Sequence, residues 1–515
     1  MEENIDSIPS GSANSKLPEE NSEEPFIIPY NISDLKGYHP KSGIVEEVIH
    51  PTKKLKLCPL LNPKLDVKEY KAQLIHSWKR RLSLMSNDVE ILKDPFQVCV
   101  INNLLDNTEF VDGIRHDFDE VEWAKRKIDL YEFFQSKDLK HLDHTYIKEF
   151  YAFLKEVVMP WVAELTGFEL INISATCSCY TNTDFLLVHD DQNEDRMVAF
   201  VYYMTGPKGW DSSKGGSLDL LSKDAKGLPD KIVKNILPKN NQLVFFPVTN
   251  DSYHQVAEVT ALEDTRLTIN GWFHVRTPPE FQSPHFEYPV SSLLGKTELK
   301  PIEKDLLLES WVRESYLNNE DGTLEDIQKY IEENSEISLT DFFRKEALDE
   351  VEQCLEMVEE NGGKWTRIAP PNRHLYEVLS TDDPLPHSLK RFLDFFQSKQ
   401  FFDYLKIITC LDFTSMKFEF QRWTPGSYCL LSDYDWNKKE LDVILYITSG
   451  EVEDIIGGRI QYLNMDEEIQ EALITIEPSK NTLDLVYRDT SRFTSYFSKQ
   501  SRCKKFYLLM CTYSE

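Results

Sequence analysis

The sequence has no long hydrophobic run and no regular cysteine framework. No apolar stretch approaches the ~20 residues of a membrane-spanning helix, and the longest clear one, 197–204, has the length of a strand. The first 25 residues have neither the basic start nor the apolar core of a signal peptide. The nine cysteines are odd in number and include no CxxC pair. This usage is typical of reduced thiols inside the cell, and it argues against a disulfide scaffold or a zinc ribbon. We therefore expect no membrane association.

Positive charge is also scarce. The 515 residues include 87 acidic and 57 basic ones, which gives a formal net charge of −30. A chain this acidic repels nucleic-acid backbones, so a nucleic-acid partner is not expected. The balance favours a basic protein as partner. The alternative interpretation is that the charge serves solubility alone.

The first half of the sequence predicts helices followed by strands. Residues 1–25 are polar and acidic, and we expect a disordered tail. Helical periodicity covers 66–84 and 143–166, with a strand-like run at 96–101 between them. Short β runs then follow at 168–180, 196–204, 216–221, 242–248 and 266–275. This order predicts an α+β domain over 26–295, with helices on one face of a β-sandwich or barrel.

The second half repeats the first. An acidic segment of helical pattern, expected as a linker over 296–365, leads to a β-rich region over 366–515. When Tyr180 is placed against Trp423, three further matches follow in order at nearly constant spacing. They are Gly215-Gly216 with Gly457-Gly458, QLVFF with TLDLV at Thr482, and RLTIN at Arg266 with KFYLL at Lys505. The chain therefore looks like two copies of one β fold.

One motif in the first copy has metal-binding chemistry. His189-Asp190-Asp191 is one of three His-x-Asp/Glu motifs, the others starting at His141 and His285. A single such motif is more often a surface pair than a ligand pair, but only His189 follows an apolar run and precedes a strand. His254 comes just past a second apolar strand. Two histidines and a carboxylate on one octahedral face suit Fe(II) and leave positions open for co-substrate and oxygen.

Two more residues fit an anionic co-substrate. Arg266 opens the strand that follows His254, and a guanidinium fork binds a carboxylate through two hydrogen bonds. Taken alone, Arg266 would be assigned to a salt bridge, whereas Tyr180, upstream of His189, fits a core aromatic and a co-substrate ligand equally well. The order Tyr180, His189, Asp191, His254, Arg266 is much more specific than any member, and it points to 2-oxoglutarate held beside iron.

At these residues the sequence resembles the prolyl-hydroxylase branch of the 2-oxoglutarate oxygenases. Within that branch it is similar to the family that hydroxylates a proline in the decoding-centre protein of the small ribosomal subunit. The resemblance covers nearly the whole chain after the tail, and many relatives have a glycine where this chain has YTNTD. The matching stretches are YTNTDFLLVHDD, RMVAFVYYM, GGSLDLL, FFPVTNDSYHQVAEV and RLTINGWFH.

The resemblance implies two tandem double-stranded β-helix (jelly-roll) domains with flanking helices, of which only the first binds metal. It implies His189, Asp191 and His254 as Fe(II) ligands and Tyr180 and Arg266 as 2-oxoglutarate ligands. O2 is then the second co-substrate, and ascorbate is expected as reductant. The implied reaction is 3-hydroxylation of a prolyl residue, extending in some relatives to 3,4-dihydroxylation, in a basic ribosomal protein. We expect the cytoplasm and nucleus as its location; residues 51–57 are a weak nuclear-import candidate.

Two alternative functions remain open at this stage. A nucleic-acid demethylase of the same fold usually has a second arginine six residues after the co-substrate arginine, where this chain has Trp272. The other alternative is an oxygen-sensing regulator that controls a partner, such as a hypoxia-response transcription factor, through 340–515. In the second copy, Ser432, Tyr434 and about Thr494 align with His189, Asp191 and His254, so we expect that half to bind partners and no iron.

Overall fold

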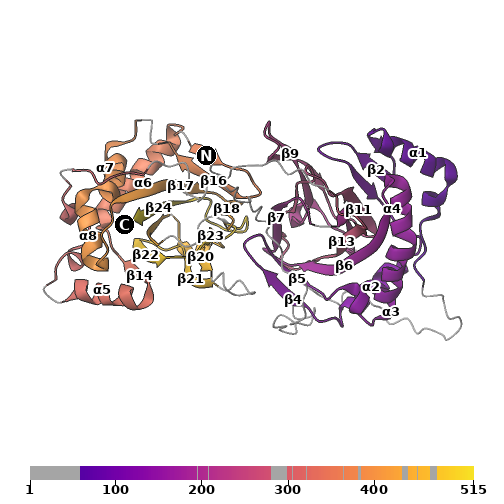
Figure 1. Cartoon of the computed structure of the whole chain (residues 1–515), viewed down its shortest axis with the longest axis horizontal. Helices are drawn as coiled ribbons and strands as arrows, with labels where there is room; N and C mark the ends of the chain where they lie inside the picture. Colours follow the sequence, from indigo (N-terminus) through magenta and orange to yellow (C-terminus); the bar gives the residue numbers. More distant parts are fainter. Residues whose placement is uncertain are drawn as a thin grey trace, which may run out of the picture.

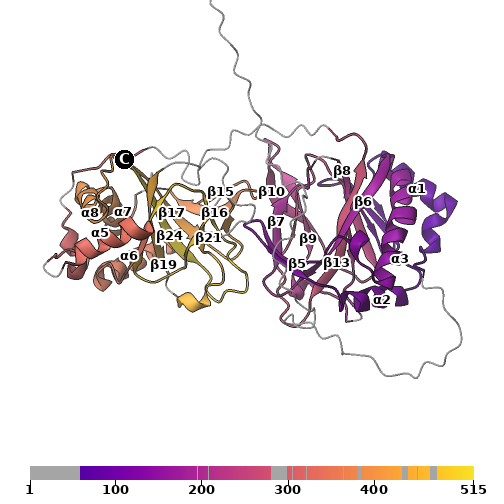
Figure 2. The ribbon, with the colours of Figure 1, turned by 60° about the horizontal axis from the view of Figure 1, so that its bottom comes forward.

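The computed structural model describes residues 58–515, except 194, 207, 280–297, 304–305, 320–321, 364, 381–383, 432–438, 449 and 464–471. The expected disordered tail, the basic segment 51–57, Ser432 and Tyr434 lie outside the described residues. The described chain forms two β-sheets that face each other at the middle of an elongated molecule (Figure 1). Helices cover the outer side of each sheet, at the two ends of the molecule (Figure 2).

The N-terminal half has the predicted order of helices and strands. The strands at the centre of the first sheet begin and end within a few residues of the predicted runs. Its elements are η2 (Pro63–Asp66), α1 (Lys68–Lys79), β1 (Leu84–Met85), β2 (Val89–Leu92), β3 (Val98–Ile101), α2 (Glu109–Phe118), β4 (Ala124–Lys127), β5 (Tyr131–Gln135), η3 (Leu139–His141), α3 (Thr145–Phe153), the π-helix η4 (Leu154–Val158), α4 (Met159–Thr166), β6 (Leu170–Tyr180), β7 (Phe185–His189), β8 (Arg196–Tyr203), η5 (Ser212–Lys214), β9 (Leu218–Lys223), β10 (Pro229–Ile236), β11 (Gln242–Pro247), β12 (His254–Val256) and β13 (Arg266–Val275).

The predicted helix at 143–166 is present as α3, η4 and α4 in succession. Its apolar stripe packs with α1 and α2 against the first sheet in one continuous core. Gly167 ends the helix in the left-handed conformation, at φ 83°, which glycine adopts without steric cost. The helices therefore cover one face of these strands. The other face of β3, β8 and β11 packs against β9 and β10 of the same half.

Antiparallel pairing within the first sheet already brings the candidate site residues together. Its strand order is β1-β2-β3-β11-β8-β13-β6-β5-β7-β12-β9-β10, with β4 paired to β5. His254 in β12 lies directly opposite His189 in β7. Arg266 at the start of β13 lies directly opposite Tyr180 at the end of β6.

The C-terminal half has helices on the outside and a second antiparallel sheet on the inside. Its elements are η6 (Leu308–Ser310), η7 (Glu314–Tyr316), α5 (Thr323–Asn334), β14 (Glu336–Thr340), α6 (Lys345–Glu360), β15 (Trp365–Ile368), β16 (His374–Leu379), α7 (His387–Gln397), α8 (Lys399–Thr409), β17 (Ser415–Trp423), β18 (Tyr428–Cys429), β19 (Glu440–Ile447), η8 (Val452–Asp454), β20 (Ile460–Leu463), β21 (Ala472–Ile476), β22 (Thr482–Arg488), β23 (Arg492–Thr494) and β24 (Phe506–Ser514).

The second sheet has the same strand order as the first. It runs β14-β22-β19-β24-β17-β16-β18-β23-β20-β21, with β15 paired to β16. Each strand from β3 to β13 thus has a counterpart in the corresponding place. Both glycine pairs, Gly215-Gly216 and Gly457-Gly458, have positive φ. In both, the second glycine faces the first residue of the last strand, Arg266 or Phe506.

This topology corrects two details of the sequence alignment. Phe506, and not Lys505, is the counterpart of Arg266, because Phe506 pairs with Trp423 as Arg266 pairs with Tyr180. Arg492, and not Thr494, is the counterpart of His254. His254 pairs with Leu220, which lies four residues after Gly216 in the sequence. Arg492 pairs with Tyr462, which lies four residues after Gly458.

The region 296–365 differs from the helical linker that its sequence pattern predicts. Strand β14 pairs with β22 at the edge of the second sheet. Side chains of α5 and α6 share one apolar core with α7, α8 and the second sheet. These helices therefore belong to the C-terminal body and are not a spacer.

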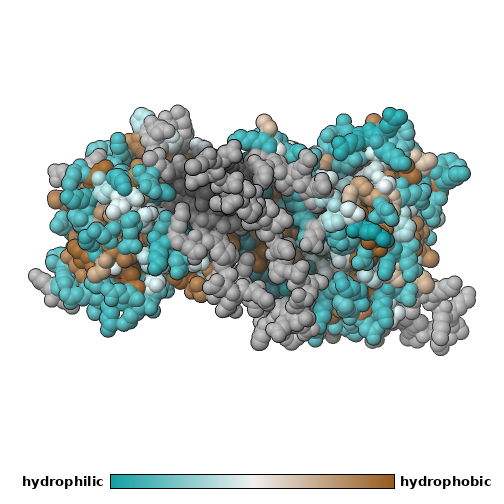
Figure 3. Space-filling model, viewed as in Figure 1, coloured by the Kyte–Doolittle hydropathy of each residue, from teal (hydrophilic) through white to brown (hydrophobic). Residues whose placement is uncertain are grey.

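Hydrophilic side chains cover much of the described surface on the face shown in Figure 3, with apolar side chains scattered between them. No helix among the described residues is long and apolar enough to cross a membrane.

Candidate metal and co-substrate site

Two short neighbouring strands bring three metal-binding side chains together. His189 is the last residue of β7, His254 the first of β12, and Asp191 follows β7 in a left-handed conformation at φ 64°. Asp tolerates that conformation better than most residues, and it turns the carboxylate back toward both rings. Oδ1 of Asp191 lies 3.4 Å from Nε2 of His189, and Oδ2 lies 3.4 Å from Nε2 of His254. One ligand atom from each side chain lies within 4.8 Å of the others.

Backbone carbonyls orient both imidazole rings. Nδ1 of His189 is 2.8 Å from the carbonyl oxygen of Leu187, and Nδ1 of His254 is 2.7 Å from that of Ser252. A carbonyl can only accept, so each Nδ1 carries the proton and donates it. The lone pair of each Nε2 is then directed at the common centre, which is the tautomer a metal requires.

Electrostatics keeps the carboxylate of Asp191 charged. Burial opposes its ionisation, but the nearby His254 and His189 outweigh burial and hold the pKa of Asp191 well below its usual range. Burial likewise lowers the pKa of His189, yet the hydrogen bond and charge of Asp191 raise it overall. The cluster is thus a buried anion between two nitrogen donors and suits a divalent cation.

Arg266 provides a buried positive charge next to this cluster. Its side chain is 1% exposed, and its Nε donates to the carbonyl oxygen of Gly216 over 2.7 Å. The guanidinium lies between two aromatic rings, 5.0 Å from the ring centre of Tyr180 and 5.1 Å from that of Tyr203. Among the described residues, no carboxylate forms an ion pair with it. A buried guanidinium without an anionic partner fits a carboxylate guest.

Two parts of this pocket were not predicted from the sequence. Tyr203 ends β8 and faces Arg266, but its place in an apolar run made it indistinguishable from a core residue. The guanidinium of Arg196 stacks 3.6 Å from the ring centre of Trp272. Burial lowers the pKa of Arg196, and the nearby charge of Asp191 opposes that shift. The alternation of β8 could have indicated Tyr203 only if the strand's inner face had been known.

Comparison with known proteins decides the family. The 2OG-Fe(II) oxygenase superfamily matches residues 175–274, and a family described as "Oxoglutarate and iron-dependent oxygenase degradation C-term" matches 303–515. The chain is 33% identical to "Prolyl 3-hydroxylase sudestada1" of Drosophila melanogaster, over 88% of this chain and 91% of that one. The chain belongs to the prolyl hydroxylase family of 2-oxoglutarate- and Fe(II)-dependent dioxygenases.

Other relatives agree with this membership. The chain is 30% identical to "Prolyl 3-hydroxylase OGFOD1" of Mus musculus, over 83% of this chain and 89% of that one. It is 24% identical to "Prolyl 3,4-dihydroxylase OGFOD1" of Ostreococcus tauri, over 85% of this chain and 98% of that one. A solved prolyl-4-hydroxylase from Pseudomonas putida is 18% identical and covers 35% of this chain and 92% of its own, but its TM-score of 0.29 is too low to support an argument.

Membership of this family means an enzyme that uses Fe(II), 2-oxoglutarate and O2. It also excludes the nucleic-acid demethylase interpretation, in agreement with Trp272 at the position of the second arginine.

Proposed function

We propose that this dioxygenase hydroxylates C3 of a prolyl residue in a basic protein of the small ribosomal subunit, with C4 of the same ring as a second position of attack. The observation that carries the proposal is the cluster of His189, Asp191 and His254 beside the buried Arg266, which has no carboxylate partner among the described residues. The names of the relatives, 3-hydroxylase and 3,4-dihydroxylase, support the position of attack. The net charge of −30 supports a basic substrate. A ribosomal substrate also supports a location in the cytoplasm and nucleus.

In this proposal each site residue has one role. His189, Asp191 and His254 would hold Fe(II), and the carboxylate of Asp191 would balance part of the metal's charge. Arg266 binds the distal carboxylate of 2-oxoglutarate, with the hydroxyls of Tyr180 and Tyr203 as further donors. Bound iron supplies the oxidising chemistry that places one atom of O2 on carbon while 2-oxoglutarate becomes succinate and CO2. The protein orients both co-substrates and shields them from water.

We further propose that the two sheets are tandem jelly-roll domains, and that only the first binds metal. The domain limits proposed from the sequence are 26–295 and 366–515, with 296–365 now attached to the second. In the second sheet Arg492 replaces His254, and its guanidinium lies 2.7 Å from the buried carboxylate of Asp442. Phe506 replaces Arg266 and stacks on Trp423, 5.8 Å between ring centres. A fixed cation and an aromatic stack would fill the places of metal and co-substrate.

The direct test is a hydroxylation assay on isolated small-subunit ribosomal proteins. The full-length protein is incubated with Fe(II), 2-oxoglutarate, O2 and ascorbate as reductant, and tandem mass spectrometry then locates any added oxygen. We expect the mass of one or two oxygen atoms on a single prolyl residue, dependent on 2-oxoglutarate. Added oxygen on another residue type, or none on any ribosomal protein, would contradict the proposal.

A second candidate function is regulation of a partner protein, such as a hypoxia-response transcription factor, through 340–515. The description of the family matched at 303–515, a degradation C-terminal region, favours it. Catalysis and regulation can coexist in one chain. Full-length His189→Ala would separate them: a partner that the variant still holds is bound independently of catalysis, and one that it loses is not.

A further inference from the structure

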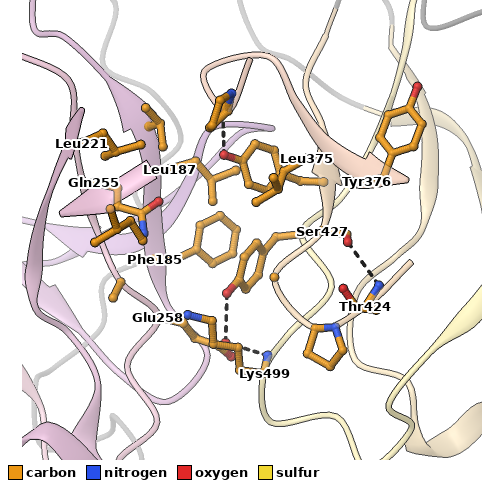
Figure 4. Close-up of a pocket in the computed structure, with 18 of the residues that line it drawn as sticks. Phe185, Leu187, Leu221, Gln255, Glu258, Leu375, Tyr376, Thr424, Ser427 and Lys499 are labelled. Atoms are coloured by element: carbon orange, nitrogen blue, oxygen red, sulfur yellow. Dashed lines mark hydrogen bonds between the residues drawn. The ribbon is translucent and has the colours of Figure 1, made fainter. Parts of the chain in front are cut away.

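The strands that carry the candidate iron ligands are covered on their outer face by the C-terminal half. Leu186 of β7 packs inward with Val256 of β12, whereas Phe185 and Leu187 pack outward with Tyr428 and Tyr496. Between the halves lies a cavity of about 440 Å³ (Figure 4). Its lining includes Leu187 and Gln255, which are close in sequence to His189 and His254. The two halves therefore meet directly behind the site.

Glu258, which follows β12, is held by the opposite half. The side chain is 2% exposed. Oε2 accepts the backbone N–H of Lys499 over 2.7 Å and the hydroxyl of Tyr496 over 3.3 Å, and Oε1 accepts the hydroxyl of Ser498. Figure 4 shows Glu258 next to Lys499, with dashed lines for the hydrogen bonds between the residues drawn. Among the described residues, every hydrogen-bond donor to this carboxylate comes from the C-terminal half.

The loop that binds Glu258 also contacts β7. The ring of Tyr496 lies 4.5 Å from the ring of Phe185, centre to centre. The amide of Gln500 donates to the carbonyl oxygen of Thr260 over 3.3 Å. The segment 496–500 thus contacts both the strand that ends at His189 and the chain that leaves His254.

The contact lies where equivalent positions of the two halves meet. A Cβ at Gly215 would lie 2.0 Å from the carbonyl oxygen of Glu258, and one at Gly457 would lie 1.9 Å from that of Tyr496. Glu258 and Tyr496 are therefore counterparts, and they bind each other. In this respect the interface resembles that of a symmetric dimer, where the same patch of each partner meets at the axis.

We propose that segment 496–500 of the C-terminal half positions the iron site, and that Glu258 is a positioning residue through which it acts. The proposal rests on the proposed roles of His189, Asp191 and His254. Strand β12 has only three residues, and although its pairing with β9 is regular, its pairing with β7 contains a register shift, so both of its ladders are short. The contacts of segment 496–500 with Glu258 and Phe185 hold β12 and β7 on the face opposite the candidate metal ligands. Removing a group that hydrogen-bonds directly to a metal ligand typically weakens metal affinity about 10–100-fold, and we expect this more distant support to act near the lower end of that range.

The test is metal binding by full-length protein without substrate. Tyr496→Phe keeps the ring on Phe185 but loses the hydroxyl, and Ser498→Ala loses the second donor. Calorimetry with Mn(II) should give a Kd raised about tenfold or more in the double variant. The visible charge-transfer band of the anaerobic Fe(II)–2-oxoglutarate complex should weaken or shift. Ser498→Thr keeps a hydroxyl at this position. Unlike Ser498→Ala, it should therefore show the Mn(II) Kd and the charge-transfer band of the wild type.

A matched control is available elsewhere in the same interface. Arg367 of the C-terminal half lies 3.4 Å from the carboxylate of Asp230 in the N-terminal half. Asp230 belongs to strand β10, which carries no candidate metal ligand. Arg367→Gln should loosen the interface but leave the Mn(II) Kd unchanged. An unchanged Kd in the Tyr496 and Ser498 variants, with normal binding by the wild type, would overturn this proposal alone. A wild type that bound no metal would overturn the proposed iron site as well. Circular dichroism confirms that each variant is folded, and if Ser498→Ala does not fold, the Kd of Tyr496→Phe alone still tests the proposal.

Discussion

At the scale of single residues, the carboxylate of Asp191 is the element that a metal centre can least do without. We predict that Asp191→Ala abolishes 2-oxoglutarate turnover and leaves the fold intact, because the site loses the carboxylate that lies between the two histidines. Succinate formation measures the effect. Asp143→Ala is the control, since it removes the carboxylate of another His-x-Asp motif, on the surface. Wild-type succinate production by Asp191→Ala would contradict the assignment.

Arg266 gives a second prediction at this scale. Replacing it with alanine should raise the KM for 2-oxoglutarate strongly, because a buried carboxylate would lose its two-fold hydrogen-bonded partner. The expected cost is on the order of 2–5 kcal/mol, or roughly 30- to several-thousand-fold. Arg266→Lys should recover only part of this, since a point charge cannot replace the guanidinium fork. If KM stays the same in steady-state assays of the alanine variant, the co-substrate binds elsewhere.

The residues of the site could be predicted from the sequence to different degrees. His189, Asp191, His254, Tyr180 and Arg266 were proposed because they stand at strand ends in a specific order, and the structure brings the first three together and pairs Arg266 with Tyr180. Tyr203 was not, because a tyrosine in an apolar run also suits a core. Glu258 was not, because its role depends on Ser498 and Tyr496, which only the packing of the two halves brings near.

At the scale of elements, the turn before β9 shapes the proposed co-substrate pocket. Gly216 has φ 66°, and a Cβ there would lie 2.9 Å from Cδ of Arg266. We predict that Gly216→Ala displaces the guanidinium and raises the KM for 2-oxoglutarate, besides a loss of stability of about 1 kcal/mol or more. Gly458→Ala is the matched control, because its Cβ would meet Phe506 in the other sheet. It should cost stability without changing KM. Equal KM effects of the two variants would refute this role of the turn.

Strand β22 carries a buried carboxyl group, that of Asp484, where ionisation is unfavourable. Burial, opposed by the Ser338 hydroxyl, raises the pKa of Asp484 to about 7, and its Oδ2 has no hydrogen-bond partner among the described residues. In an unfolded chain the pKa is about 3.9, so between these values the folded state holds a proton that the unfolded state releases. Stability should therefore fall as pH rises from about 4 to 7 and stay reduced above.

Asp484→Asn should remove that dependence. Relative to wild type, the variant should gain stability at pH 8, on the order of a few kcal/mol, and the gain should vanish near pH 4. Melting temperatures across this range measure it, with the exposed Asp489→Asn as control. A gain of equal size at every pH would rule out the titration of Asp484 as its cause.

The fold was predictable where periodicity is strong. The helices at 143–166 and the central strands of the first sheet follow from apolar spacing. Register in the second sheet was off by one residue at Phe506 and by two at Arg492, because loop lengths between short strands differ and sequence matching cannot see pairing. Strand β14 was missed because its alternation, EISLT, covers only five residues and lies between two longer acidic stretches of helical pattern.

At the scale of the whole molecule, the protein consists of two halves of one strand order, and we propose that the first performs the chemistry while the second supports it. The net charge of −30 supports the proposed basic substrate, and the C-terminal half lies directly behind the strands of the candidate site. In the second half, Arg492, Phe506 and Trp423 stand where the first has His254, Arg266 and Tyr180. The molecule should therefore contain a single metal centre despite its repeat.

The stoichiometry of metal binding tests this central claim most directly. Full-length protein, stripped of metal, is titrated with Mn(II) by calorimetry, and the measurement is repeated with Asp191→Ala. We predict one equivalent of metal in the wild type and none at comparable affinity in the variant. A second equivalent of similar affinity, or binding that survives the loss of Asp191 unchanged, would contradict the claim.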